Sequence, residues 1–479
     1  MNTICFRSSG RESSPRSRRV LAAALSLAAA LVAAFAPASL RADDFTFHEP
    51  SARAAGLGGA FTARADDATA IFYNPAGLAF LGGFRVKTNI MFGKRETAAS
   101  WPAGGPGPFK TDPPEFIGDA ALCWQPFKRV TIGTGLFSPF IYESYWTPGW
   151  SAETVVGRNR LRSLYFRSVV AVEPLKGLAL SAGVDIISSS LRWLHATPFN
   201  IPNYPLVRDV NVDSSHRLHG RGMGLVAGAL WKIVPAVQIG ARYQEHAAID
   251  YAGTDVFNAQ LDISGVIVPD PHRPSRRVSD LIDFYYATQD VKGRLTLPRE
   301  VAGGVALTPF PPLSLYVDIV WDRWSDFGDW IFSSVNEGQA LSPGFTPDYQ
   351  QFYGLALDYG VQGVALNLRD TKAVKTGLEY RPVKYVSVRA GYARHQSSVD
   401  AAGRTPVYPD LDRNVYSLGF GYEGPLFSIW GGDERISDLS FDVFVRYATG
   451  GPAPSAFPGF EMTYDSSRFS FGFGAGLVF

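Results

Sequence analysis

Charged side chains recur on several segments whose alternate positions are apolar, and these charges are the residues best placed to do chemistry. Neighbouring carboxylates act as a general acid and base when their environments push their pKa values apart. Charges of both signs that are spread over many segments are more typical of ion pairs that hold an internal structure in place. We therefore expect ion pairs rather than catalysis, with Arg389 as the candidate for meeting an anionic group. The set comprises Asp318, Asp322, Lys375, Glu379, Arg389, Glu423, Asp442 and Arg446.

Other arrangements that could support catalysis or metal binding are weak in this sequence. His216 and His219 have two residues between them but no further metal-type ligand nearby, so we expect exposed loop histidines. No Gly-rich phosphate loop leads from a strand into a helix. A lipase-type enzyme would need a recognisable Ser/His/Asp set, and the chain offers only scattered candidates. We predict no enzymatic activity, no metal and no cofactor.

Fourteen strand-like segments must position the charged residues. Long amphipathic helical patterns are hard to find, whereas runs with period-two alternation are frequent. The predicted strands span residues 84–93, 117–125, 129–138, 162–173, 178–193, 217–231, 236–251, 291–308, 313–327, 371–381, 385–395, 414–423, 438–447 and 468–479.

The connections between these segments alternate in length. Short connections carry Pro or Gly, and a somewhat longer one covers 424–437. Short turns on one side and long loops on the other are typical of outer-membrane barrels, and an even strand number places both termini at the periplasmic side. The seven longer loops fall at 94–116, 139–161, 194–216, 252–290, 328–370, 396–413 and 448–467.

Side-chain parity favours strands with one face in lipid. From Leu313 to Trp321 the odd positions are all apolar, whereas the even positions include Asp318. A soluble β-sandwich also alternates in this way. Large aromatic residues at strand ends on the apolar face, together with the terminal Phe479 inside a strand, favour a membrane barrel with an interfacial girdle. These aromatic residues are Trp321, Tyr422 and Tyr447.

The predicted fold class is an all-β membrane protein, a 14-stranded antiparallel transmembrane β-barrel over residues 84–479. An open sheet edge in hydrocarbon would leave backbone groups unpaired, so the sheet must close. A barrel of this size encloses a lumen that its own side chains do not fill. We therefore expect residues 43–83 to form an N-terminal plug, or hatch.

Residues 1–42 have the pattern of a secretory signal peptide. A basic start precedes an apolar stretch from Val20 to Ala36, and small residues near Ala42 offer a cleavage site. A transmembrane helix is the competing interpretation, but the apolar run is at the short limit for spanning a bilayer. Removal of this segment takes away six Arg and one Glu and leaves 39 basic against 43 acidic residues, which excludes a nucleic-acid-binding surface. Cys123 is then the one remaining cysteine.

The predicted hatch contains a stretch rich in small residues, Gly56–Leu78, that has neither strand nor core-helix periodicity. Within it, Asn74, Pro75, Ala76 and Gly77 form a common turn signal. Taken alone, this motif is read best as an ordinary turn. Its position between an export signal and a series of strands makes a compact plug the alternative.

The sequence resembles the FadL family of outer-membrane transporters for long-chain fatty acids and other hydrophobic compounds. The resemblance covers essentially the whole mature chain and is carried by several short motifs in family-like order. They are Asp66-Asp67 with Asn74-Pro75-Ala76, then Leu297-Pro298, residues 321–327, Asp370-Thr371, residues 377–382, 389–392 and 396–399, and finally Pro409-Asp410 with Asp412-Arg413.

The resemblance implies a route for a hydrophobic ligand. In the family, the ligand lodges among extracellular loops, moves to a pocket above the hatch, and leaves sideways where the third strand kinks inward. Here the resemblance places Asn74, Pro75 and Ala76 in a hatch element near that opening. The third strand is residues 129–138, and Gly133 and Gly135 are the candidate kink, because missing side chains permit a bend. The alternative is that these glycines simply relieve crowding in the lumen.

The loop at 139–161 supports a greasy ligand. Its aromatic side chains include Phe140, Tyr142, Trp146 and Trp150, and exposed apolar clusters of this size commonly bind something. Self-packing of the loop, or anchoring in the outer leaflet, is the alternative.

The resemblance thus implies a cell outer-membrane protein whose partners are a long-chain fatty acid or another hydrophobic small molecule and the lipid of the outer membrane. Within the barrel, Arg389 is the candidate for meeting a fatty-acid carboxylate. We expect a monomer. An aromatic-hydrocarbon channel, a non-selective porin and an outer-membrane lipase are the alternatives.

Overall fold

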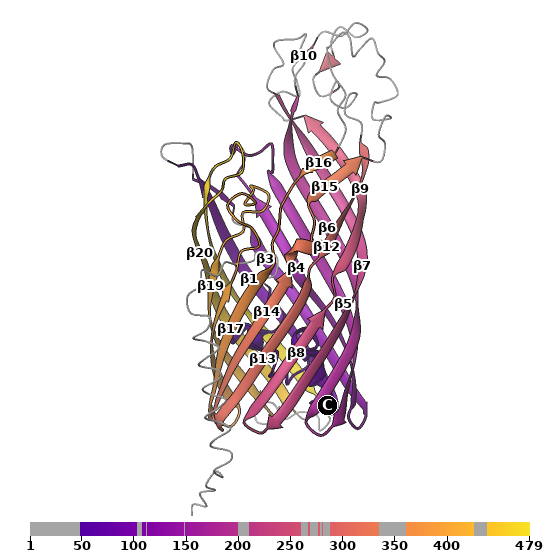
Figure 1. Ribbon diagram of the computed structural model, residues 1–479, viewed down its shortest axis with the longest axis vertical. Helices are drawn as coiled ribbons and strands as arrows, with labels where there is room; N and C mark the ends of the chain where they lie inside the picture. Colours follow the sequence, from indigo (N-terminus) through magenta and orange to yellow (C-terminus); the bar gives the residue numbers. More distant parts are fainter. Residues whose placement is uncertain are drawn as a thin grey trace, which may run out of the picture.

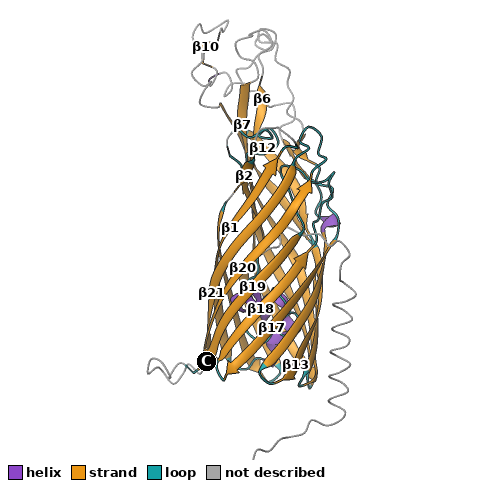
Figure 2. Cartoon of the chain, turned by 90° about the vertical axis from the view of Figure 1, so that its left-hand side faces the viewer, coloured by secondary structure: helices purple, strands orange, loops and turns teal. Residues whose placement is uncertain are grey.

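The computed structural model is a tall barrel of tilted strands with short helices inside its lower third (Figures 1 and 2). The structure describes residues 48–102, 108–111, 113–147, 149–199, 210–259, 267–268, 276–277, 280, 288–334, 361–425 and 438–479. The predicted signal peptide, residues 43–47 of the predicted hatch and most of the 424–437 connection lie outside these residues.

Fourteen antiparallel strands close into the barrel, which confirms the predicted 14-stranded, nearly all-β antiparallel barrel. The first and last strands pair along their whole lengths, from Arg85 opposite Val478 to Ser100 opposite Thr463. Twelve barrel strands carry one label each and their bounds are β1 (Phe84–Ser100), β3 (Pro114–Phe127), β4 (Val130–Tyr145), β5 (Arg158–Leu175), β6 (Leu178–Phe199), β7 (Val210–Val234), β14 (Leu313–Arg323), β17 (Thr371–Val383), β18 (Val386–His395), β19 (Arg413–Gly424), β20 (Asp438–Pro454) and β21 (Thr463–Val478).

Two further barrel strands are each broken in the middle. One consists of β8 (Val237–Gln244) and β9 (Ala247–Ala259), and the next consists of β12 (Gln289–Leu297) and β13 (Arg299–Phe310), which are separated at Pro298. Proline lacks the N–H that a ladder needs, so a break at this residue is expected. Short additional strands lie near the long-loop side, namely β2 (Phe109–Thr111), β10 (Ile267–Val268), β11 (Arg276–Arg277), β15 (Trp330–Ser334) and β16 (Val361–Val364).

The observed strands extend further toward the long loops than the sequence predicts. β4 runs to Tyr145 instead of residue 138, and β7 begins at Val210 instead of residue 217. Above the apolar band these strands no longer have an apolar outer face, so the alternation that identifies them fades. As a result, Phe140, Tyr142 and His216 lie on strands and not in loops.

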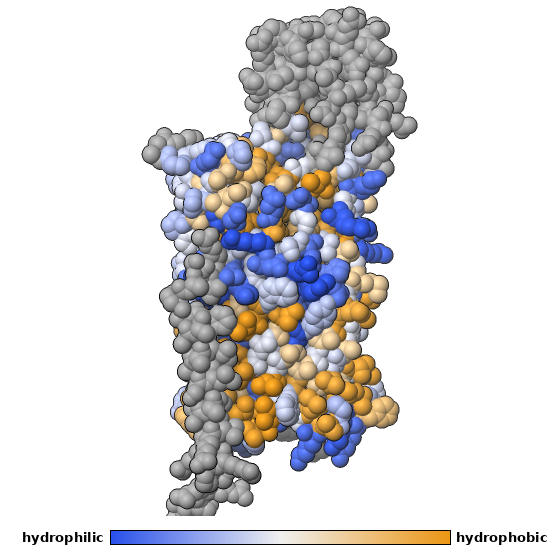
Figure 3. All heavy atoms as spheres, in the orientation of Figure 1, coloured by the Kyte–Doolittle hydropathy of each residue, from blue (hydrophilic) through white to orange (hydrophobic). Residues whose placement is uncertain are grey.

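The outer wall carries the apolar side chains that parity predicts. Phe441, Val445 and Tyr447 are exposed on β20, while Phe469 and Phe471 are exposed on β21. Figure 3 shows hydrophobic side chains concentrated over the lower part of the barrel, with hydrophilic ones above them and at the lower rim. Among the described residues, none of the helices is long and apolar enough to cross a membrane.

Residues 48–83, which we call the lumen segment, lie inside the barrel (Figure 2). Helix α2 (Ala52–Gly56) begins after Ser51, whose hydroxyl accepts from the backbone N–H of Ala54. It ends before Gly58 and Gly59, which take positive φ angles of 68° and 82°, a conformation that glycine adopts at low cost. The remaining helices are α3 (Ala70–Tyr73) and the 3₁₀ helix η1 (Pro75–Phe80).

Candidate functional site

A chain of ion pairs joins the lumen segment to the lower wall. The Arg53 guanidinium of the segment lies 3.3 Å from Glu379. Glu379 lies 2.8 Å from Arg389, which in turn lies 2.6 Å from Asp442. Both carboxylates and both guanidiniums are buried, so each charge depends on its partners for compensation. Arg389 is therefore neutralised by two carboxylates.

The same chain returns to the segment through Lys87 on β1. Its ammonium lies 2.8 Å from Asp442 and 2.8 Å from Asp67. Burial alone would raise the pKa of Asp67, but Lys87 and Arg53 outweigh burial and lower it. Of the charges predicted to face inward, Glu423 alone is exposed, at the end of β19.

A second anchor is Glu49, near the start of the described segment. Its carboxylate lies 2.9 Å from Lys375 and accepts a 2.8 Å hydrogen bond from Tyr73. Burial by itself would raise the pKa of Glu49, but the charges of Lys375 and Arg446 lower it to about 2. This carboxylate is ionised and held by the wall.

Backbone groups of the segment are held by inward side chains as well. Asp318 on β14 accepts from the backbone N–H of Phe61 at 2.8 Å and of Thr62 at 2.7 Å. Arg167 on β5 forms a bidentate pair with Asp185 and donates to the carbonyl of Ile71 at 3.1 Å. These contacts fix the position of the chain between the two helices and of α3.

Asn74, Pro75 and Ala76 lie inside the barrel against β7. The Asn74 amide donates to the carbonyls of Thr62 and Ala229, both at 2.9 Å, and its oxygen accepts from the N–H of Ala76. Pro75 starts η1, where its missing N–H costs nothing. The motif thus cross-links two parts of the segment to the wall.

Gly133 and Gly135 face the lumen segment from β4. A Cβ atom at Gly133 would lie 2.6 Å from Leu78, and one at Gly135 would lie 2.8 Å from Phe72. The two glycines leave the space that these side chains occupy. Their pairing with β3 and β5 is continuous in register.

The irregularity in β4 lies a few residues further, at Ser138 and Pro139. Pairing with β5 shifts between Phe137 and Phe140, so that both of these aromatic side chains face inward. The inserted residue of a β-bulge changes the parity of all residues that follow. At the same level, pairing between β3 and β4 stops with Ala120 opposite Leu136. The upper parts of these strands, from Pro114 on β3 and up to Tyr145 on β4, are not paired with each other.

A small cavity of about 80 Å³ lies between the lumen segment and this part of the wall. This volume is below the range of roughly 300–1,000 Å³ that is usual for small-molecule sites, so a cargo molecule would need the surrounding side chains or the lumen segment to move. Phe137, Pro139 and Phe140 line it from β4, and Phe72 and Tyr73 line it from the segment. Polar groups converge on it as well, namely His48, Glu49, Arg242, Gln244, Glu300, Asp322, Lys375 and His395.

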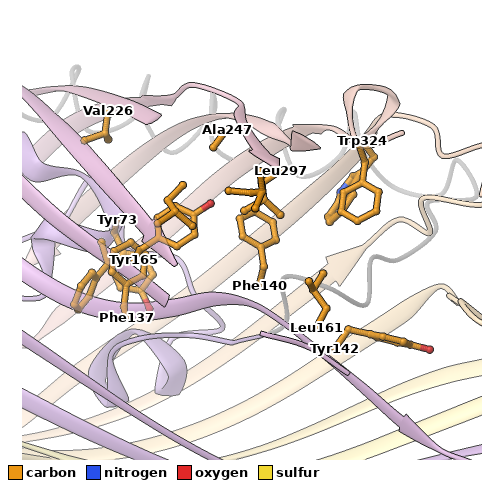
Figure 4. Close-up of a cluster of buried hydrophobic side chains, with 14 of the residues drawn as sticks. Tyr73, Phe137, Phe140, Tyr142, Leu161, Tyr165, Val226, Ala247, Leu297 and Trp324 are labelled. Atoms are coloured by element: carbon orange, nitrogen blue, oxygen red, sulfur yellow. The ribbon is translucent and has the colours of Figure 1, made fainter. Parts of the chain in front are cut away.

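Above the cavity the interior is aromatic (Figure 4). Phe140 packs edge-on against Trp324, with ring centroids 6.1 Å apart, and Trp146 stacks on Trp150 at 4.2 Å. The Tyr142 hydroxyl donates to the carbonyl of Val407 at 2.8 Å. All four of these aromatic residues are buried, so they do not form the expected exposed cluster; Trp146 and Trp150 pack on each other, whereas Phe140 and Tyr142 pack on residues outside the 139–161 segment. Aromatic residues of other segments cover them, since Tyr408 packs on Tyr142 and Tyr464 on Trp146.

Sequence reasoning missed several residues of this interior. Arg167 shares the parity of Tyr165 and Val169, so applying the alternation rule to its strand would have placed it inward. His48 lies 2.7 Å from Asp119, beside the place where β3 and β4 separate, and no sequence pattern indicated this pair. His216, predicted to be exposed, is buried and stacks on Trp193 at 5.0 Å, whereas His219 faces outward.

Cys123 lies on β3 opposite Gly133 and is buried among residues of the lumen segment and the wall. Within the described residues, no three His, Cys, Asp or Glu side chains are grouped so that they could hold a metal ion.

The comparisons with known proteins agree with this architecture. The family described as "Outer membrane protein transport protein (OMPP1/FadL/TodX)" matches residues 29–425. A FadL homologue from Pseudomonas aeruginosa is 17% identical with a TM-score of 0.70, and the alignment covers 91% of this chain and 100% of that one. A search of curated proteins found no match.

Two solved toluene transporters share the fold. TodX from Pseudomonas putida is 16% identical with a TM-score of 0.62, and TbuX from Ralstonia pickettii is 15% identical with a TM-score of 0.60. Each alignment covers 91% of this chain and 99% of the relative. At these identities the structures establish the fold alone. The family match, which spans most of the chain, and the closed barrel together show that this chain belongs to the OMPP1/FadL/TodX family of outer-membrane transport proteins.

Proposed function

We propose that this protein takes up long-chain fatty acids or similarly hydrophobic compounds, acting as a monomer. Residues 43–83 serve as the hatch that closes the lumen. Cargo enters among the aromatic side chains of the upper interior and moves to the cavity beside the lumen segment. It leaves sideways between β3 and β4 into the bilayer, and ligand binding, not an energy source, displaces the hatch.

The observation that carries this proposal is the end of β3–β4 pairing beside the cavity. The last register pair, Ala120 with Leu136, lies just below Phe137, Pro139 and Phe140, which line the cavity. A hydrophobic molecule gains about 0.8 kcal/mol for each CH₂ that stays out of water, so a lateral exit suits it better than an aqueous pore.

Each candidate site residue has a role in this proposal. Asn74, Pro75 and Ala76 tie the hatch to the wall, and Gly133 and Gly135 accept hatch side chains. Arg389 belongs to the ion-pair chain that seats the hatch, because its two carboxylate partners leave it unsuited to a cargo carboxylate. The first aromatic contacts for cargo are Phe140, Tyr142, Trp146 and Trp150.

A monoaromatic hydrocarbon is the second candidate cargo. The stacked rings of the upper interior suit a flat ligand, and two of the solved relatives are described as toluene transporters. Lys375 and Arg242 at the cavity are each paired with a carboxylate, Glu49 and Glu300, so the cavity itself does not separate a fatty acid from an aromatic cargo.

The test of the exit route is a crosslink between β3 and β4. Cysteines at Gly118 and Ser138, joined by a short thiol crosslinker in a Cys123→Ala background, would bridge the unpaired parts of the two strands. We expect oleate uptake to fall at least tenfold and to return when a cleavable linker is cut. The matched control joins Leu122 and Thr134, which are already register partners, and should leave uptake unchanged. Full uptake through the upper crosslink would refute lateral exit here.

The cargo and the hatch are tested in the same cells. Labelled oleate is offered with toluene as a competitor, and a deletion of residues 43–83 is compared with the full chain. Uptake of oleate that toluene does not reduce supports the fatty-acid assignment, and strong competition supports the aromatic one. Passage of small hydrophilic solutes through the intact protein would indicate a porin instead, and release of fatty acid from a phospholipid would indicate a lipase.

A further inference from the structure

Three arginines form a row on the outside of the barrel. Arg160 on β5, Arg192 on β6 and Arg217 on β7 are successive register partners. Arg192 and Arg217 are exposed, and Arg160 is partly exposed. Like charges directly opposite each other on neighbouring strands are destabilising. An anion lying on the row would remove this repulsion.

Two more arginines, Arg162 and Arg221, adjoin the row, and we call the five residues the arginine patch. Glu143 is the carboxylate that pairs with members of the patch, at 3.5 Å from both Arg160 and Arg162. In the part of the chain that the structure describes, Arg192, Arg217 and Arg221 form no ion pair. The carboxylate opposite Arg221 is Asp250, which pairs with Arg294 instead. Positive charge is therefore left over.

The patch lies at the upper edge of the lipid-facing band. Directly below it the outward side chains become apolar, with Phe166 45%, Ile186 53% and Met223 68% exposed. Alternate residues on a strand are about 7 Å apart. Arg221 is thus one side-chain step above Met223, at the level where lipid head groups lie, on the side of the long loops.

The opposite wall has a different boundary. There Tyr392, Tyr416 and Tyr447 are successive register partners on β18, β19 and β20, all facing outward. Aromatic residues at this level are typical of an interfacial girdle. Among the described residues the two walls thus differ at this level, with a row of arginines on one side and a row of tyrosines on the other.

We infer that the arginine patch binds the phosphate groups of an anionic glycolipid of lipid A type in the outer leaflet. The planar guanidinium forks bind phosphate bidentately, which a row of parallel side chains favours. Clusters of basic residues at a membrane surface recognise anionic head groups. The apolar side chains below the patch contact the acyl chains of the same molecule.

The experiment uses the full-length protein in nanodiscs of neutral phospholipid with a small fraction of bisphosphorylated lipid A. Glycolipid retained per protein is measured by native mass spectrometry. We expect Arg192→Gln with Arg217→Gln to reduce retention about tenfold, since both guanidiniums contact phosphate. The matched control replaces two outward cations of the other wall, Lys372→Gln with Arg394→Gln, and should retain the wild-type amount. Heat-modified mobility on gels confirms that each barrel is folded.

Three outcomes would overturn the inference. Equal retention by both double variants would mean that the arginines merely extend into water. Equal retention of the dephosphorylated glycolipid would show that the patch does not recognise phosphate. Displacement of the glycolipid by millimolar inorganic phosphate would indicate a simple anion site.

Discussion

The lower and upper halves of the barrel interior are held by different forces. In the lower half, individual polar contacts hold the lumen segment. An example is the pair of hydrogen bonds that the Asp318 carboxylate accepts from the backbone N–H groups of Phe61 and Thr62. Above, ring packing predominates, as where Trp146 stacks on Trp150, and the hydrogen bonds are ones between neutral groups such as that from the Trp150 indole N–H to the Val156 carbonyl. A lost polar partner leaves a buried charge or N–H uncompensated, whereas apolar packing tolerates substitutions that conserve volume. We therefore expect an apolar ligand to disturb the upper half more readily than the polar contacts of the lower half.

The largest expected effect comes from Arg167→Met, which leaves Asp185 buried without its partner and the Ile71 carbonyl without a donor. We expect the free energy of opening of the lumen segment to fall by about 3 to 5 kcal/mol. Hydrogen exchange of the backbone amides of residues 51–80 measures it. The double variant Arg167→Met with Asp185→Leu should recover part of this loss. No recovery would show that Arg167 acts through the backbone contact alone.

Acid should release the same segment. The pKa of Glu49 is about 2 in the folded protein and 4.5 without its partners, so ionised Glu49 stabilises the fold above pH 4.5. This contribution, of about 3 kcal/mol, is lost as pH falls from 4.5 through 2. Hydrogen exchange of residues 51–80, corrected for the intrinsic rate, should rise over that range. Glu49→Gln should remove most of this pH dependence, and an unchanged dependence would assign it to other carboxylates.

A smaller effect is expected from Asp318→Asn, which keeps the shape but removes the charge from two hydrogen bonds. We expect a loss of roughly 1 to 2 kcal/mol in the stability of the segment, because a charged acceptor binds more strongly than a neutral one. Hydrogen exchange of the Phe61 and Thr62 backbone amides measures this loss of stability directly. Asp290→Asn, on the outer face of β12, is the control and should leave both amides protected. Equal protection in all three proteins would mean that neighbouring packing holds this part of the chain.

The smallest effect is expected in the upper half, from Leu161→Met. The residue is fully buried in the aromatic region, and this volume-conserving change should cost less than about 1.5 kcal/mol. Exchange in residues 51–80 should not change, because no directional contact joins Leu161 to the segment. Faster hydrogen exchange in residues 51–80 would show that the two halves of the interior are coupled, and the proposed difference between them would then be wrong.

Sequence periodicity predicted the strands well where a strand crosses lipid and poorly beyond that. The alternation from Leu313 to Trp321 exists because one face contacts hydrocarbon, and it disappears once both faces meet water or loops. β4 was therefore ended near residue 138, and Phe140 and Tyr142 were placed in a loop.

For the candidate site, the sequence predicts which face of a strand each residue occupies but not which residues it contacts. Parity placed Asp318, Glu379 and Arg389 inward, as observed. It could not pair Arg389 with Asp442, because these residues lie on β18 and β20, and the stagger of both strands against β19 decides which side chains meet. The bulge at Ser138 and Pro139 was also missed, although a proline inside a strand indicates a bulge or a strand edge, because the predicted strand stops one residue before Pro139.

The position of Cys123 makes the lumen segment observable without any engineered label. Its thiol is 1% exposed and is covered from the inside by the segment, while Gly133 on the next strand offers no side chain to protect it. Because it is the single cysteine after residue 42, alkylation by a membrane-impermeant maleimide would report one event, the departure of the segment from β3. The rate of that reaction, measured with and without cargo, would report how often the lumen segment leaves β3 in intact cells.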